Sequence, residues 1–283
     1  MSEPVSQAQQ HGALPISLVI PARNAAHVIE VCLAAAKANG AREIIVVDGE
    51  SEDETVSISH RFADQVLSDG GGGVAYARQM GAEAATSSHV AFIDVDIELP
   101  SDALSGLLNE LQERNLEAIQ AGLHSVGGVD YWSRALVAHH NRGRSKRWFG
   151  VMSSLFQRDV FLRYGMDPAF RTGEDIELRY RLRKGGARVA VSDSVVVNHS
   201  FEPGFGFALG QFLADGAGLG RMFRKHGWPA FSLLAIPVGG AVLGVFRSLV
   251  RQPVFIPYYV LYAIFNYVGI VRGLLDRNVK RAP

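Results

Sequence analysis

Short apolar runs and helical segments alternate through the first hundred residues, and this alternation constrains the fold more than any other feature. The nearly all-apolar runs are residues 16–20, 43–47, 66–67 and 89–93. Helical patterns occupy residues 26–39, 55–62 and 74–86 between them. Strand–helix–strand order at this spacing predicts βαβ units and a parallel sheet. Continuously apolar strands are expected where helices cover both faces of a sheet. We therefore predict an α/β fold with a mostly parallel, Rossmann-like sheet.

Polar residues follow three of these runs at the point where each predicted strand ends. They are Arg23 with Asn24, residues 48–53, and Asp94 with Asp96. In open α/β sheets, ligands bind at the carboxyl ends of the strands. One crevice should therefore collect all three groups.

The sequence Asp94-Val95-Asp96 closes the fourth run. Neighbours two apart in a strand share a face, so both carboxylates can point at one place. Hard carboxylate oxygens suit Mg²⁺ or Mn²⁺ and leave room for diphosphate oxygens. Such a metal would neutralise charge on a leaving nucleoside diphosphate. A strand-end turn with solvated acids explains a bare Asp-x-Asp equally well.

Two further motifs fit a nucleotide. Asp48, at the end of the second run, is placed to accept a hydrogen bond from a base or ribose. The alternative is only a strand, a turn and a helix capped by Asp53.

Residues 70–73 are four glycines that precede a predicted helix, and a helix N-terminus attracts phosphate. Arg78 in that helix has the planar fork that clamps a diphosphate. The alternative is a flexible loop and a surface arginine.

Glu174 and Asp175 begin a predicted helix, and His199 follows a strand-like run at 188–197. Acids at a helix start are favoured by the helix dipole, so simple capping is one interpretation. The other is a general base that takes a proton from an attacking hydroxyl, with Asp175 the first choice and Glu174 the reserve. Taken alone, His199 is interpreted as a structural histidine. Beside an acidic metal site it becomes a candidate metal ligand.

Six segments in this order resemble the family 2 glycosyltransferases with the GT-A fold. They are Pro21-Ala22-Arg23-Asn24, VVDGESEDET, ARQMGAEAA, FIDVDIELP, GEDIELRYRLRKGG and VNHS, within residues 16–200. The resemblance implies inverting transfer from a nucleotide-diphospho-sugar. It implies that Asp48 holds the base, Arg78 approaches the diphosphate, Asp96 binds Mg²⁺ or Mn²⁺, and Asp175 is the base.

The resemblance also defines a donor-binding set: Pro21, Ala22, Asn24, Asp48, Gly49, Ser51, Arg78 and Asp94. Gly49 and Ala25 stand where the family usually has acids, which makes base selectivity and donor identity less certain than the fold. The metal ligands are expected to be Asp96 and His199. The acceptor side is expected to include Arg147 and Trp148, because aromatic faces suit sugars; core packing explains a tryptophan just as often.

The character of the sequence changes after residue 200. Apolar stretches at about 230–246 and 254–271 approach the roughly 17–20 residues that a membrane span needs. Two spans would put Arg247 and Arg251 on the far side, against the positive-inside tendency. In-plane or re-entrant helices avoid that conflict, and buried soluble helices are the alternative. The spacing of Gly206, Gly210, Gly216 and Gly220 suggests close helix packing.

These features predict a tail at 1–14, a GT-A catalytic domain at 15–200 and a hydrophobic, membrane-associating helical appendage at 201–283. Lys and Arg (28) balance Asp and Glu (28), which argues against nucleic acid as a partner. The single cysteine, Cys32, excludes an intrachain disulfide and suits a small buried residue. No signal peptide is recognisable, so we expect a membrane-associated enzyme with a cytoplasmic catalytic domain.

The sequence therefore predicts an inverting glycosyltransferase whose acceptor is a lipid-linked or free saccharide, or a lipid. One alternative is a non-catalytic nucleotide-sugar-binding scaffold of a membrane glycan complex. Another is a phosphatase of the Asp-x-Asp type. Those need a threonine or similar small polar residue soon after the second acid, where this chain has Ile97 and Glu98.

Overall fold

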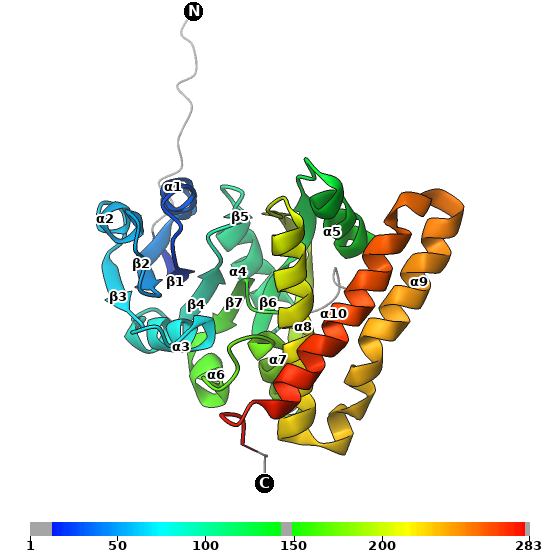
Figure 1. Cartoon of the computed structure of the whole chain (residues 1–283). Coiled ribbons are helices and arrows are strands. Elements are labelled where there is room, and N and C mark those ends of the chain that lie inside the picture. The colour runs from blue at the N-terminus through cyan, green and yellow to red at the C-terminus, as the bar shows by residue number, and fades with distance from the viewer. Residues whose placement is uncertain (1–12, 143–148, 281–283) are drawn as a thin grey trace, which may run out of the picture.

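The computed structural model describes residues 13–142 and 149–280, in which one mixed sheet is covered by helices and followed by a C-terminal helical layer (Figure 1). The strands are β1 (Leu14–Ala22), β2 (Ala41–Asp48), β3 (Gln65–Ser68), β4 (His89–Ile93), β5 (Ile97–Glu98), β6 (Ala118–Val126), β7 (Ser153–Gln157) and β8 (Val189–Ser200). The helices are α1 (Ile29–Ala38), α2 (Thr55–Ser59), α3 (Val74–Ala84), α4 (Ala103–Glu113), α5 (Tyr131–Arg142), α6 (Arg158–Tyr164), α7 (Glu174–Lys184), α8 (Phe205–His226), α9 (Ile236–Arg251) and α10 (Ile256–Leu275). Short 3₁₀ segments, η2 (Trp228–Ala235) and η3 (Pro253–Phe255), precede α9 and α10. Most of the predicted tail lies outside the described residues.

The strand order is β3-β2-β1-β4-β7-β6-β8-β5. The first four strands in this order are parallel, which confirms the predicted βαβ units. Their register places Ala22 opposite Asp48, and Asp48 opposite Ser68. The polar residues that follow β1 and β2 therefore leave the sheet at one edge.

From the sequence alone, residues 155–164 are predicted to form a helix, and this prediction is wrong in its first part. Residues 153–157 form β7, which pairs antiparallel with both β4 and β6, and only 158–164 are helical. Leu155 and Phe156 are fully buried between the two layers of helices. A short apolar run reads alike as a buried strand or a buried helix turn, so periodicity alone could not separate them.

Alternate residues of β1 face two separate cores. Ile16, Leu18 and Ile20 pack with α1 and α4, whereas Val19 faces α3 on the other side. Both faces of the sheet are thus apolar, as the unbroken hydrophobic runs predicted. Cys32 is buried in the first core, in agreement with the interpretation of a small packing residue.

Helix α8 packs against α10 through two of its four regularly spaced glycines. A Cβ at Gly216 would collide with the backbone of Asn266, and one at Gly220 with the backbone of Ile270. Gly206 and Gly210 have no atoms of another segment within reach of a Cβ. Close helix packing is therefore confirmed for the second pair only.

We expect Gly216→Ala to lower the free energy of unfolding by about 1–3 kcal/mol, because the added methyl group overpacks the α8–α10 contact. The matched control is Gly210→Ala, in the same helix but facing open space. It should raise stability by up to about 1 kcal/mol through helix propensity. Denaturant unfolding measures both. Equal effects of the two substitutions would contradict the glycine contact.

Candidate active site

The loops after β1 and β2 are bound to each other through side chains. Asn24 N donates to Ser51 Oγ (2.8 Å), and Glu52 N donates back to Asn24 Oδ1 (2.8 Å). Gly49 N donates to Ala22 O (2.8 Å). The structure thus brings together the predicted donor-binding residues of these two loops.

Asp48 is the buried acid of this pair of loops. Its Oδ2 accepts a hydrogen bond from Ser51 N (3.0 Å), which fixes the turn. Its Oδ1 is buried and has no partner among residues 13–142 and 149–280. A buried acceptor without a donor is costly, so this oxygen suits a hydrogen bond from a bound base or ribose.

The glycine loop before α3 is organised by an acid that sequence reasoning missed. Gly71 N and Gly73 N donate to the carboxylate of Asp69 (2.7 and 3.0 Å). Gly70, Gly71 and Gly73 have positive φ, which explains the glycines. Gly70 N donates to Ser68 Oγ and Gly72 N to Asp69 O, so all four N–H groups of the loop are occupied by the protein itself, which disfavours a phosphate cradle here.

Arg78, on α3, is 3% exposed and not a surface arginine. Its Nη1 donates to Glu174 (2.8 Å), and its Nη2 donates to both oxygens of Asp94 (2.6 and 3.0 Å). One guanidinium therefore ties the end of β4 to the start of α7. Both terminal nitrogens are engaged, so contact with a diphosphate stays a prediction and the evident role is that of a cross-link.

Asp96 and His199 meet because β5 pairs antiparallel with β8, which aligns Ile97 with His199. His199 Nε2 lies 3.1 Å from Asp96 Oδ2. The Asp96 side chain is 47% exposed and His199 is 12% exposed. The two predicted metal ligands are thus adjacent, and Asp96 is the one that is open to solvent. The described residues contain no group of three or more metal-binding side chains.

Asp175 and Glu174 have separate environments although they are neighbours. Glu174 is paired with Arg78; burial nevertheless raises its pKa to about 6, with the charge of Asp175 adding to the effect. Asp175 Oδ1 accepts from Ile176 N (2.8 Å), while a Cβ at Gly150 would lie 3.2 Å from Asp175 Oδ2. Burial also raises the pKa of Asp175, against its hydrogen bonds and the charge of Arg78. A raised pKa makes this carboxylate the better proton acceptor.

Arg147 and Trp148, predicted for the acceptor side, lie outside the described residues.

The model of the family described as glycosyl transferase family 2 matches residues 17–167, which is more than half of the chain. The match includes Asp48, Arg78, Asp94 and Asp96, and it ends before α7 and β8. The chain belongs to this family.

Known proteins agree with this assignment. The chain is 24% identical to the succinoglycan biosynthesis protein ExoA of Rhizobium meliloti (strain 1021), over 92% of this chain and 86% of that protein. Its fold is similar to that of the mannosyltransferase PcManGT from Pyrobaculum calidifontis, solved with GDP-Man and Mn²⁺ (TM-score 0.65, 18% identity, 93% of this chain and 88% of that one). It also resembles mannosyl-3-phosphoglycerate synthase from Rubrobacter xylanophilus (TM-score 0.54, 19% identity, 74% of each chain). The protein is a family 2 glycosyltransferase with the GT-A fold.

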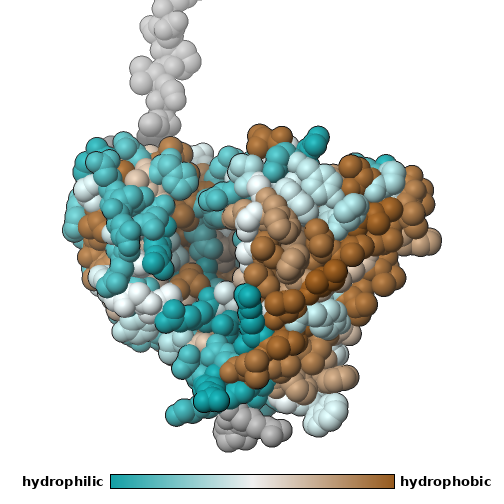
Figure 2. All heavy atoms as spheres, in the orientation of Figure 1, coloured by the Kyte–Doolittle hydropathy of each residue, from teal (hydrophilic) through white to brown (hydrophobic). Residues whose placement is uncertain are grey.

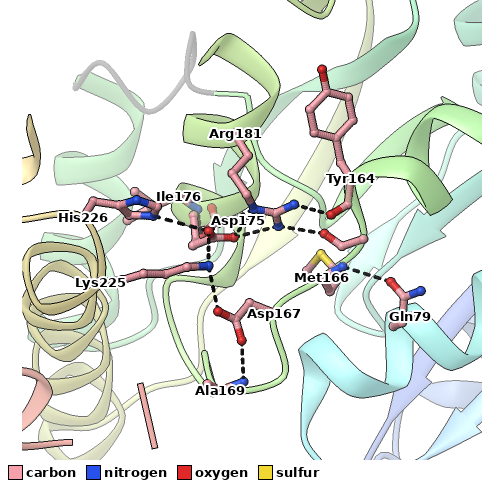
Figure 3. Close-up of polar contacts among 12 residues, drawn as sticks. Gln79, Tyr164, Met166, Asp167, Ala169, Asp175, Ile176, Arg181, Lys225 and His226 are labelled. Carbon is pink, nitrogen blue, oxygen red and sulfur yellow. Dashed lines mark hydrogen bonds and ion pairs between the residues drawn. The ribbon is translucent and has the colours of Figure 1, made fainter. Parts of the chain in front are cut away.

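In this glycosyltransferase, the helix that carries Asp175 is anchored by a buried network that sequence reasoning also missed. Glu177 is fully buried and contacts Arg181 (2.7 Å) and Lys225 (2.5 Å). Figure 3 shows Lys225 and His226 of α8 pointing toward α7, with Lys225 also reaching Asp167 (2.8 Å). Burial opposes the charge of Glu177, but the close contact of His226 (3.3 Å) and the hydrogen bonds from Arg181 lower its pKa to about 2. The network fixes α7 against α8.

Proposed function

We propose that the enzyme transfers a sugar, with inversion, from a nucleotide-diphospho-sugar to a hydroxyl of a lipid-linked or saccharide acceptor. The observation that carries this proposal is the double ion pair of Arg78 with Asp94 and Glu174. It draws the neighbouring acids Asp96 and Asp175 toward one region, at the edge of the sheet where ligands bind.

Donor binding would use the paired loops after β1 and β2. Asp48 Oδ1, buried and without a partner, would accept a hydrogen bond from the base or ribose. The remaining predicted contacts, through Pro21, Ala22, Asn24, Gly49 and Ser51, stay proposals that rest on their position in the same two loops.

A divalent cation fits the pair of Asp96 and His199. An exposed carboxylate oxygen beside an imidazole nitrogen offers two protein ligands and leaves the other positions to diphosphate oxygens and water. When bound, the metal would neutralise charge on the leaving diphosphate. Asp94 would act by holding Arg78, because its two oxygens are already engaged.

Asp175 would deprotonate the acceptor hydroxyl as that hydroxyl attacks the anomeric carbon. Its carboxylate oxygen next to Gly150 faces no side chain of that residue, so the glycine leaves space beside the base. Arg147 and Trp148 stay candidates for the acceptor side.

The proposed division into a catalytic part (15–200) and a membrane-associating part (201–283) rests on the exposed apolar surface of the last helices. Residues Trp228–Arg251 and Pro253–Leu275 are apolar enough to cross a membrane by length and composition, and only 22% and 39% of their apolar windows are buried. Figure 2 shows a hydrophobic band over these helices. The exposed apolar residues of α9 are Ile236, Val238, Val242, Leu243, Phe246, Leu249 and Val250.

The arrangement of these helices favours an in-plane position over a span. Helix α10 lies between α9 and α8 (Figure 1), and it contacts α8 at both Gly216 and Gly220. Gly218 of α8 in turn touches Gly173, at the start of α7. A span by α10 would therefore pull part of the catalytic domain into the bilayer. Lying flat, α9 and α10 would place Arg247 and Arg251 at the headgroups of a cytoplasmic membrane surface.

A donor screen tests the proposed reaction. The purified enzyme is incubated with a panel of UDP- and GDP-sugars, and release of UDP or GDP is measured with Mg²⁺, with Mn²⁺ or with EDTA. We expect turnover of a donor in this panel, and a loss of about 100-fold with EDTA or in Asp96→Asn. Asp193→Asn, at a side chain 98% exposed, is the control. Turnover indifferent to EDTA would reject the metal. Hydrolysis of a simple phosphomonoester instead would favour a phosphatase.

Vesicle flotation tests the membrane surface. We expect the wild type to float with vesicles of phosphatidylcholine and phosphatidylglycerol, and the double variant Leu243→Glu/Phe246→Glu to stay in solution, because two charges would enter the apolar face. Val31→Glu is the matched control, since Val31 is an exposed apolar residue of α1 outside that face. Unchanged flotation of the double variant would contradict the assignment of this face.

A further inference from the structure

Helix α8 carries an acid, Asp215, that none of the motifs above includes. Phe212, Asp215 and Gly218 follow one another at three-residue spacing, so they lie along one side of the helix. Gly218 packs directly on Gly173, where a Cβ on either residue would come within 3.0 Å of the other. Because Gly173 immediately precedes α7, this contact brings Asp215 to the neighbourhood of Asp175.

Hydrogen bonds fix this contact between the helices. Arg221, one turn after Gly218, donates through Nη1 to Thr172 Oγ1 (2.6 Å) and through Nε to Asp276 (2.8 Å). The middle of α8 is thus held against the residues that lead into α7. The proximity of Asp215 to Asp175 is therefore a property of the packed core.

Asp215 is an exposed residue of α8, and protein nevertheless lies around its carboxylate. Its desolvation by the surrounding protein, together with the like charge of Asp175, raises the pKa of Asp215 to about 7. Within residues 13–142 and 149–280, no hydrogen bond or ion pair satisfies its carboxylate.

Two more polar groups near this part of α8 lack partners in the described part of the chain. Asn266 is 1% exposed, lies against Gly216, and has an unpaired Oδ1. His139 Nδ1 is also buried and unpaired, and its ring lies 4.8 Å from that of Tyr262. Tyr262 packs on Phe212, one turn before Asp215. Buried polar groups left without partners cost free energy and mark places where a polar ligand or water binds.

We propose that Asp215 is an acceptor-binding residue that accepts a hydrogen bond from a sugar hydroxyl adjacent to the one that Asp175 deprotonates. This inference rests on the proposed function of Asp175. Two neighbouring carboxylates match two neighbouring hydroxyls of a sugar ring. The same pair repels an anionic nucleophile, and Arg78 is already engaged by Asp94 and Glu174. Arg179 is a further cation near Asp175, on the same helix.

The chemical class of the acceptor follows from this charge pattern. The attacking group is a hydroxyl of a neutral sugar with a second hydroxyl beside it, whether or not a lipid carrier is attached further away. A phosphate oxygen of a polyprenyl phosphate is disfavoured as the attacking group, because its negative charge would approach Asp175 and the partly ionised Asp215.

The test compares neutral and anionic lipid-like acceptors with the donor that the screen identifies. Octyl glucoside, octyl galactoside and octyl mannoside are the neutral probes, and farnesyl phosphate is the anionic probe. Transfer is measured beside slow hydrolysis of the donor by water. In Asp215→Ala, we expect kcat/KM for the glycoside to fall about 10- to 100-fold more than donor hydrolysis falls. Asp215→Asn, whose amide oxygen can still accept the hydrogen bond, should lose less. Asp193→Ala should change neither rate.

Deoxy acceptors locate the contact. A glycoside that lacks the hydroxyl next to the attacked one should lose a similar factor with the wild type, and little more with Asp215→Ala. Additive losses would overturn the proposed contact, and so would a wild-type preference for farnesyl phosphate. Unaltered thermal unfolding of the Asp215 variants shows that they fold. Absence of UDP or GDP release from every donor by the wild type would instead reject the proposed function itself.

Discussion

Asp175→Asn is expected to lower the rate of sugar transfer by about 10²- to 10⁴-fold, the range over which a positioned general base contributes. The amide keeps the shape of the side chain, and its oxygen can still accept the hydrogen bond from Ile176 N. It cannot take a proton from the acceptor hydroxyl. Donor affinity should survive, because the proposed base and ribose contact lies at Asp48. Transfer assays and donor titration calorimetry measure the two effects separately.

Glu174→Gln is the comparison for this experiment, because Glu174 is the other candidate base. Its carboxylate is bound to Arg78, so its loss should weaken the cross-link between α3 and α7 and reduce transfer less than Asp175→Asn does. Full transfer by Asp175→Asn would reject the assignment of the base. Donor binding without transfer by the wild type would favour the non-catalytic scaffold.

The pH dependence of transfer follows from the environment of Asp175. Burial raises the pKa of this carboxyl, so it is protonated at a higher pH than an exposed aspartate. A protonated carboxyl cannot act as a base, and transfer should therefore fall as the pH drops through this raised pKa. Asp175→Asn should lose this acidic limb of the rate profile.

Local sequence could predict those strands whose apolar runs end at polar residues, because the polar residues mark where each strand stops. Runs such as 16–20 and 43–47 are bounded on both sides, and the structure has β1 and β2 there. β7 was mistaken for helix because Phe156 lies four positions before Val160 of α6, which is the spacing of one helical turn. What separates the two is pairing with β4 and β6, and this depends on residues far away in the sequence.

The same distinction applies to the site. Asp96 and His199 are 103 positions apart, and the resemblance to a family, rather than spacing, suggested that they meet. From local sequence, Glu177 is only one more acid in the first turn of α7. Its partner Lys225 lies 48 positions away, so no local pattern reveals the ion pair. The signal that could have revealed this network is the basic group Arg224-Lys225-His226 at the end of an apolar helix. If that end is buried, its charges need an anion nearby.

Glu177→Gln is expected to lower the free energy of unfolding by about 3–5 kcal/mol at pH 7, because it leaves Lys225 and Arg181 partly buried without their shared anion. Denaturant unfolding measures the loss. The matched control is Glu113→Gln, at an exposed position near the end of α4, which should change stability by less than about 0.5 kcal/mol. Similar small effects of both substitutions would contradict the network.

The pH dependence of this loss supplies a second test. The pKa of Glu177 is about 2 in the folded protein, below its ordinary value of 4.5, so its charge stabilises the fold fully above pH 4.5. That stabilisation disappears as the pH falls from 4.5 toward 2, and the gap between wild type and Glu177→Gln should close over this interval. Glu177 shares α7 with Asp175, and Lys225 shares α8 with Asp215. Loosening this anchor should therefore misalign the two carboxylates and slow transfer even where the variant remains folded.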